Sequence, residues 1–178
     1  MEDNAILTKR KIEAIAEQYS ISDLLYKDTF LQTPSGNSVF LSHSSDDKNF
    51  IRKLIIFLKY GKGGVDAYVD WQDPMIPSET DVITAKRLKE RISDASKFIY
   101  VATTNSLKSV WCSWELGFAD KAKGVNSIAI LAVKPNNGRW KKNEYLQQYP
   151  WIQYDISNNL FLVKMPDGST QTLAEWLL

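Results

Sequence analysis

Short apolar segments alternate with amphipathic segments along most of this 178-residue chain, and that order constrains the fold more than any other feature. The apolar runs cover residues 39–41, 67–69, 98–101 and 128–133. Between them, apolar side chains recur at helical spacing, for example at Phe50, Leu54 and Phe57. Strands that are continuously apolar and alternate with helices predict an α/β fold, in which helices cover both faces of a parallel sheet.

The first part of the chain predicts a separate helical arm. Ile12, Ile15, Ala16 and Tyr19 follow the spacing i, i+3, i+4, i+7 of one helix face. A second short helix is expected from Ser22, and residues 33–37 form a turn-rich linker. We therefore divide the chain into an arm, 1–34, and a main domain with a C-terminal extension, 35–178.

The C-terminal part predicts more sheet and a closing helical turn. Residues 149–156 supply a further strand candidate. Residues 161–164 and 170–172 flank the turn Pro166-Asp-Gly168, which predicts a hairpin. A helical turn is expected over 173–178.

Composition and charge favour a soluble, cytoplasmic protein. The formal net charge is +1, so nothing in the balance demands nucleic acid or a membrane surface as a partner. The longest apolar run, 128–133, is too short to span a bilayer. Met1-Glu-Asp-Asn lacks the pattern of a signal peptide. A single cysteine, Cys112, excludes an internal disulfide and a cysteine-rich zinc site.

The segment 109–120 predicts a helix with one acid among aromatic side chains. Trp111, Glu115 and Phe118 share one side at helical spacing, with Trp114 adjacent. An acid in an apolar stripe is costly unless something uses it. The alternative is an exposed glutamate in a surface ion pair, but its helical neighbours four residues away are Trp111 and Ala119. Glu115 is therefore the main functional candidate.

Other reactive residues favour structural roles. His43 with Cys112 suggests a thiol nucleophile pair, yet a buried structural cysteine and polar packing of the histidine are commoner. Asp46 and Asp47 are expected to favour the N-terminus of the helix that follows, with a magnesium site as a minor alternative. The basic residues after the Glu115 helix form a solvated face or attract the phosphates of a nucleotide or an acidic partner. They are Lys121, Lys123, Lys134, Arg139, Lys141 and Lys142.

Three motifs resemble the toll/interleukin-1 receptor (TIR) domain family, in the family's order and spacing between residues 38 and 155. They are Val39-Phe-Leu-Ser-His-Ser-Ser-Asp46, Tyr68-Val-Asp-Trp71 and Trp111-Cys-Ser-Trp-Glu-Leu116. The resemblance is strongest to bacterial stand-alone and antiphage-defence (Thoeris-like) members. It implies a flavodoxin-like TIR fold with a five-stranded parallel sheet, here with an added N-terminal helical arm and a C-terminal hairpin. Some TIR domains are enzymes and others are scaffolds, so fold alone leaves the function open.

In the enzymatic branch, the resemblance implies that Glu115 is catalytic and that NAD is the substrate. Nicotinamide is cleaved from ribose, and some members cyclise the ADP-ribose into a second messenger, sensed by a downstream effector. No further cofactor and no metal are implied. Trp111 and Trp114 would line the pocket, and Phe40 and Ser42 match positions that approach the nucleotide.

The second motif and the loop after it are implied to complete the site. Asp70 and Trp71 follow a strand at the sheet edge where such folds bind ligands. Residues 72–80 match the BB loop, which joins neighbouring protomers in this family and implies a homo-oligomer. This loop contains Pro74 and Pro77 but lacks an arginine found in some members.

Two other functions remain open from the sequence. One is a non-enzymatic adaptor that associates with other TIR domains through the BB loop, around Pro74 and Ile76. The other is an enzyme similar to nucleoside deoxyribosyltransferases, which also use a carboxylate at an N-glycosidic bond.

Overall fold

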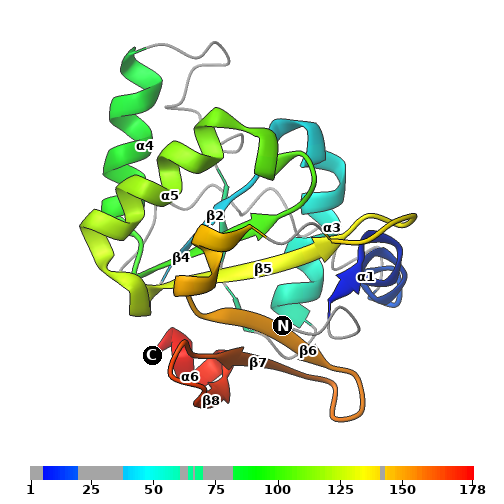
Figure 1. Cartoon of the computed structure of the whole chain (residues 1–178). Helices are drawn as coiled ribbons and strands as arrows, with labels where there is room; N and C mark the ends of the chain where they lie inside the picture. The colour runs from blue at the N-terminus through cyan, green and yellow to red at the C-terminus, as the bar shows by residue number, and fades with distance from the viewer. Residues whose placement is uncertain (1–5, 20–37, 61–63, 66, 70–81, 141–142) are drawn as a thin grey trace.

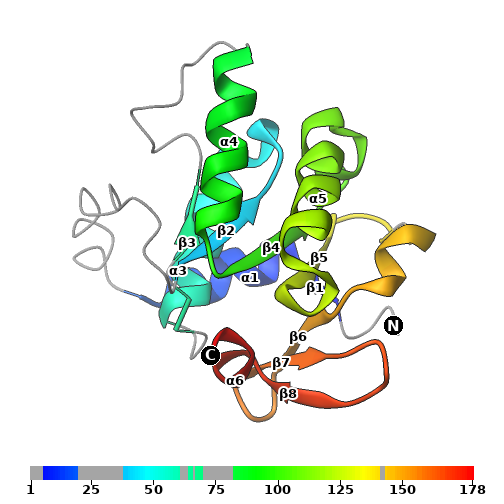
Figure 2. The same ribbon diagram turned by 90° about the vertical axis from the view of Figure 1, so that its left-hand side faces the viewer.

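Five parallel strands form the centre of the computed structural model, which describes residues 6–19, 38–60, 64–65, 67–69, 82–140 and 143–178. Their order across the sheet is β3 (Ala67–Tyr68), β2 (Val39–Ser42), β4 (Lys97–Ala102), β5 (Ile128–Lys134) and β6 (Trp151–Asp155). Of these five strands β2 comes first in the chain, with β3 on one side of it and β4 on the other (Figure 2). This is the flavodoxin-like order. The predicted α/β fold and its five-stranded parallel sheet are confirmed.

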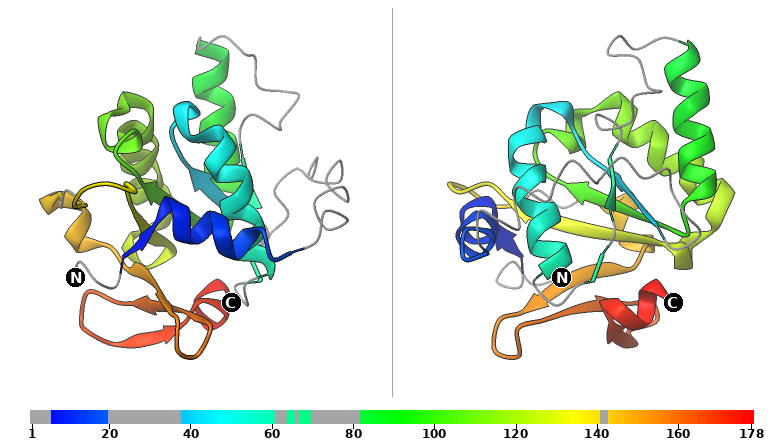
Figure 3. Two further views of the ribbon diagram at one scale, coloured as in Figure 1. Left: turned by 90° about the vertical axis from the view of Figure 1, so that its right-hand side faces the viewer. Right: turned by 180° about the vertical axis from the view of Figure 1, so that it is seen from behind.

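Helices cover both faces of this sheet, as the apolar runs predict. Helices α4 (Val82–Asp94) and α5 (Val110–Lys123) lie on one face, and α3 (Lys48–Tyr60) lies on the other (Figures 1 and 3). The sheet has an apolar core on each face, and successive residues of a strand contribute to opposite cores. In β4, Phe98 and Tyr100 pack toward α4 and α5, whereas Ile99 packs toward α3. Within the described residues, no helix has the length and apolar character needed to cross a bilayer.

A hairpin and a short helix extend the sheet at the C-terminus. Strand β6 pairs antiparallel with β7 (Leu160–Lys164), which pairs with β8 (Thr170–Thr172), and α6 (Leu173–Leu177) follows (Figure 2). Helix α6 is held by Trp176, whose Nε1 donates to the carbonyl of Asn126 at 2.9 Å. The predicted hairpin and closing helical turn are confirmed.

The described part of the N-terminal arm packs on the sheet and on α3. Strand β1 (Leu7–Thr8) pairs parallel with the end of β5, and α1 (Lys9–Ala16) lies beside α3 (Figure 3). Ile12 and Ala16 of α1 are buried. The predicted helix is confirmed, whereas the two-residue strand before it was not predicted. The helix expected from Ser22 and the linker at 33–37 lie outside the described residues. The division at residue 34 stays a prediction.

Candidate active site

A buried hydrogen bond joins the end of β2 to helix α5. The Ser42 hydroxyl donates to Glu115 Oε2 at 2.6 Å. Only 1% of Ser42 and 5% of Glu115 is exposed. Ser42 has the same parity as Phe40 along β2, so both face the layer that contains α5. A buried carboxylate needs hydrogen bonds to offset its lost hydration, and Ser42 supplies one.

Helix α5 places Glu115 on its sheet-facing side. The buried residues of this helix are Cys112, Glu115, Leu116 and Ala119, which recur at helical spacing. Glu115 is thus the one charged residue in a packed stripe, as predicted. The expected aromatic face was wrong in part, because Trp111 is 37% exposed and Phe118 is only partly buried. The aromatic residues form a flank of α5 rather than its buried face.

The aromatic flank joins α5 to α4. The ring of Trp114 lies 5.5 Å from that of Trp111 in an edge contact and 6.1 Å from that of Phe118 in a stacked one, measured between centroids. Lys89 Nζ on α4 lies 5.7 Å from the centroids of both Trp114 and Phe118. These contacts fix the Trp114 ring against Trp111 and Phe118 on α5 and against Lys89 on α4. That Trp111 and Trp114 line a substrate pocket stays a prediction.

The other predicted substrate contacts fall in two groups. Phe40 is 2% exposed and stacks on Phe98, with ring centroids 5.5 Å apart and planes 2° from parallel. It therefore packs in the core layer beneath α5, and its contact with substrate stays a prediction. Asp70, Trp71 and the loop 72–80 lie outside the described residues.

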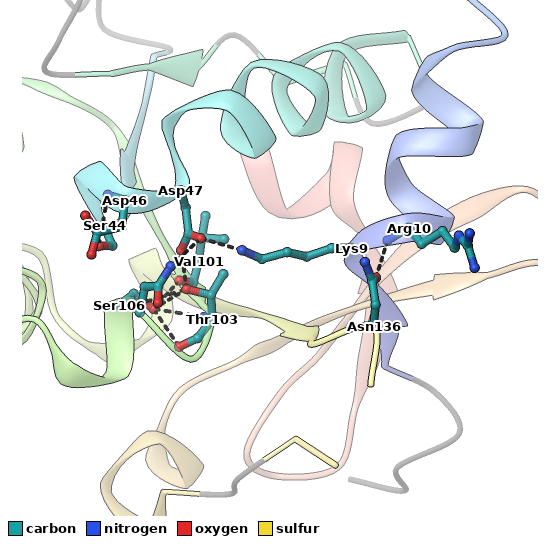
Figure 4. A network of polar contacts seen from close by, with 10 residues as sticks. Lys9, Arg10, Ser44, Asp46, Asp47, Val101, Thr103, Ser106 and Asn136 are labelled. Carbon is teal, nitrogen blue, oxygen red and sulfur yellow. Dashed lines mark hydrogen bonds and ion pairs between the residues drawn. The ribbon is translucent and has the colours of Figure 1, made fainter. Parts of the chain in front are cut away.

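A second buried carboxylate, Asp47, organises the same edge of the sheet (Figure 4). It lies in the 3-10 turn Ser45–Asp47 and is 2% exposed. Asp47 accepts hydrogen bonds from Lys9 Nζ, from Thr103 Oγ1 and, at 2.8 Å, from Asn105 Nδ2. It does more than favour the start of a helix, because it ties α1 and the loop after β4 to the loop after β2. The sequence pattern missed this network.

The remaining reactive residues have structural surroundings. His43 Nδ1 lies 2.8 Å from the carbonyl of Leu41, and Cys112 is 1% exposed in the core beneath α5. Both fit the packing roles favoured from the sequence. Among the described residues, no cluster of three His, Cys, Asp or Glu side chains is arranged to hold a metal ion.

The strand order explains why polar groups gather here. Strands β2 and β4 are neighbours, but the chain leaves β2 toward β3 on one side and β4 lies on the other. The carboxyl ends of such a pair border a crevice where α/β sheets bind ligands. Ser42 and Thr103 lie at these two ends, and Glu115 bonds to Ser42. This arrangement can present a fixed carboxylate to a bound ligand.

Replacing Ser109, the N-cap of α5, should loosen the helix that carries Glu115. Ser109 Oγ accepts a hydrogen bond from the Cys112 amide at 3.3 Å. We expect Ser109→Ala to lower the free energy of unfolding by about 1 kcal/mol, whereas Ser109→Asp, which keeps an acceptor, leaves it near the wild-type value. Urea denaturation measures both. An equal loss in the two variants would show that capping is not the cause.

The chain is similar to known proteins over its central part. The family model described as TIR domain matches residues 39–160. A protein of Bacillus cereus (strain MSX-D12), provisionally named 3′ cyclic ADP-D-ribose synthase ThsB′, is 34% identical over 119 residues, covering 64% of this chain and 59% of that protein. A protein of Cytobacillus dafuensis, provisionally named cyclic ADP-D-ribose synthase TIR2, is 32% identical over 118 residues, covering 57% of this chain and 31% of that protein.

A solved structure is also similar. It is the crystal structure of the TIR domain of the Toll-related receptor TRR-2 from Hydra magnipapillata, with a TM-score of 0.43 and 13% identity. The match covers 61% of this chain and 76% of that one. The matched region spans less than two thirds of the length of both named synthases.

Proposed function

The chain belongs to the TIR domain family, and on that basis we propose that it is an enzyme that cleaves NAD between nicotinamide and ribose. The observation that carries this proposal is the buried pair of Ser42 and Glu115, joined at 2.6 Å. A buried carboxylate opposes folding unless it is satisfied or used. The names of the two relatives, both cyclic ADP-D-ribose synthases, support the same activity.

The chemistry of this bond suits a single carboxylate. The bond joins C1′ of ribose to the positively charged ring nitrogen of nicotinamide. When it breaks, its electron pair stays on that nitrogen, so nicotinamide leaves as a neutral molecule and needs no general acid. Positive charge develops on the ribose, as in glycoside hydrolysis. We assign Glu115 to stabilise that charge, because a fixed anion in a site sheltered from water acts strongly on it.

The acceptor of the ribosyl group decides the product. Attack by water at C1′ gives ADP-ribose, whereas attack by a nucleophilic atom of the same molecule gives a cyclic ADP-ribose. We favour the cyclic product because both relatives are named for it. It would serve as a second messenger in bacterial antiphage immunity, sensed by a downstream effector. NAD is the substrate in this scheme, and no further cofactor takes part.

The rest of the site is proposed from the family resemblance. Trp111 and Trp114 would shelter the reacting bond, and Phe40, Asp70 and Trp71 would contact the nucleotide. The loop 72–80 would join protomers into a homo-oligomer, so that the site is completed by assembly. We place this activity in the cytoplasm, the compartment that the sequence favours.

Nicotinamide release from NAD tests the activity directly. Wild-type protein would be incubated with NAD at several protein concentrations, with and without a crowding agent that forces assembly. Chromatography with mass detection then identifies nicotinamide and the ADP-ribose product. Release that rises more than linearly with protein concentration supports an enzyme completed by assembly. Absence of release in every condition, with self-association intact, favours the adaptor function instead.

Replacing Ser42 should slow the reaction without preventing binding. Ser42→Ala removes a hydrogen bond to a carboxylate, worth about 1.5–3 kcal/mol, so kcat should fall about 10-fold to 100-fold. KM should change less than kcat, because we assign the hydroxyl to orienting Glu115, to which it is bonded. That Ser42 also approaches the nucleotide stays a prediction. Steady-state nicotinamide release measures both constants, with Ser113→Ala, an exposed serine of α5, as the control. A rise in KM at unchanged kcat would contradict the positioning role.

A further inference from the structure

A cavity of about 590 Å³ lies beside β6, several strands across the sheet from β2, the strand that carries Ser42. It is formed by β6, the end of β7 and the connection between β5 and β6, with Ile6 from the N-terminal segment at its wall. This volume is in the range of pockets that hold small molecules. None of its lining residues belongs to the Ser42–Glu115 pair or to the Asp47 network.

Aromatic rings form the inner walls of this cavity. Trp140 and Trp151 meet edge to face, with ring centroids 5.4 Å apart, and Tyr149 lines the same space. Trp140 is fixed by its Nε1, which donates to the carbonyl of Ala102 at 3.0 Å. Burial and the neighbouring Asp120 carboxylate raise the pKa of Tyr149 to about 12, so its hydroxyl stays neutral. These inner walls are therefore aromatic and uncharged.

Two cations lie at the rim. Arg139 precedes Trp140 in the chain, and Lys164 pairs across the β6–β7 ladder with Trp151. Both side chains line the cavity and are exposed. Within the part of the chain that the structure describes, neither forms an ion pair with a carboxylate. Gln147 and Gln153 add amide groups that can donate or accept hydrogen bonds.

The cavity is separate from the candidate active site. Strands β4 and β5 lie between β2, which carries Ser42, and β6, which carries Trp151. Three strand spacings correspond to about 14 Å. A single base ring therefore cannot lie against both Ser42 and Trp151 at once.

We propose that this cavity is a second binding site for a nucleotide, distinct from the site of NAD cleavage. A flat heteroaromatic base can stack on a tryptophan ring of the wall, which offers a large surface. Phosphate groups then reach the rim, where Arg139 provides a planar set of donors and Lys164 a compact charge. A neutral aromatic molecule would leave both cations unused, and a bare phosphate would leave the aromatic walls unused. The combination selects a ligand that carries both groups.

Binding of ADP, pyrophosphate and adenosine to the whole protein tests this proposal. Isothermal titration calorimetry would compare wild type with the double variant Arg139→Ala/Lys164→Ala. Both changes are at exposed positions, so the fold should be retained. We expect ADP to bind at least about 10-fold more tightly than pyrophosphate or adenosine, and the double variant to lose at least that factor for ADP. The matched control is Lys86→Ala/Lys121→Ala, which removes two exposed cations from α4 and α5.

The outcomes separate this site from the proposed catalytic function. The second site is supported if ADP binding survives Glu115→Gln and is lost in the Arg139→Ala/Lys164→Ala variant, while nicotinamide release by that variant equals that of the wild type. Equal ADP binding by that variant and wild type overturns it, as does pyrophosphate binding as tight as that of ADP. Absence of ADP binding to wild type also overturns it. Loss of both ADP binding and nicotinamide release in the rim variant would mean that these cations serve the cleavage site, which contradicts two separate sites.

Discussion

Replacing Glu115 by glutamine should reduce nicotinamide release from NAD by at least about 100-fold to 1000-fold, the usual effect of removing one electrostatic contact to a transition state. Glutamine has nearly the same shape, and its amide oxygen still accepts the hydrogen bond that Ser42 donates at 2.6 Å. Only the negative charge is lost. If that charge stabilises the ribosyl cation, the rate falls while the packing beneath α5 is kept. Chromatographic assay of nicotinamide, at matched protein concentration, measures the change.

The control for this variant is Glu144→Gln, which removes an exposed glutamate far along the chain. Its rate should equal that of the wild type. The melting temperature of Glu115→Gln should stay close to the wild-type value or rise, because a buried charge has been removed. A well-folded Glu115→Gln protein that releases nicotinamide at the wild-type rate would refute the proposed mechanism.

Replacing Asp47 by alanine should destabilise the whole fold, by about 2–4 kcal/mol in the free energy of unfolding. Asp47 is 2% exposed and accepts hydrogen bonds from Lys9, Thr103 and Asn105. Alanine leaves the Thr103 hydroxyl buried without this acceptor, and it unties three segments that meet at the sheet edge. Equilibrium denaturation in urea, followed by circular dichroism, gives the difference.

Asp46 provides a matched control in the neighbouring position. It is exposed, so Asp46→Ala should change the free energy of unfolding by less than about 0.5 kcal/mol. Lys9→Ala should lie between the two, with a loss of about 1 kcal/mol, because the two other donors to Asp47 remain. Equal stability of the Asp46 and Asp47 variants would show that the buried network contributes nothing.

Local patterns predicted most of the fold. Each apolar run became a strand, because a continuous apolar segment suits a strand that is buried on both faces. Parity along β2 also explains why Ser42 points to the layer of Glu115: it is two residues after Phe40, which packs on Phe98. The two members of the candidate site were therefore readable from the sequence, one by its motif and the other by its place at a strand end.

The features that sequence analysis missed depend on contacts between distant segments. Strand β1 has two residues, too few to produce a period. The Asp47 network joins residues 9, 47, 103 and 105, and no local pattern marks such a set. Helix α5 is apolar on several sides, so its composition does not decide which side faces the sheet. In the folded protein the side with Cys112, Leu116 and Ala119 packs on the sheet, and Trp111 lies at the surface.

The core that lies against α3 has a consequence for anyone who shortens this protein. The family match ends at residues 39 and 160, yet this core also contains side chains from both sides of those limits. They are Leu7, Ile12, Ala16, Phe161, Val163, Leu173 and Trp176. A fragment cut at the family limits would expose apolar surface on α3 and β5, and would leave the Asp47 carboxylate without Lys9. The segment that matches the family is therefore shorter than the segment needed to bury this core. A protein shortened to the family match would expose an apolar patch and tend to aggregate.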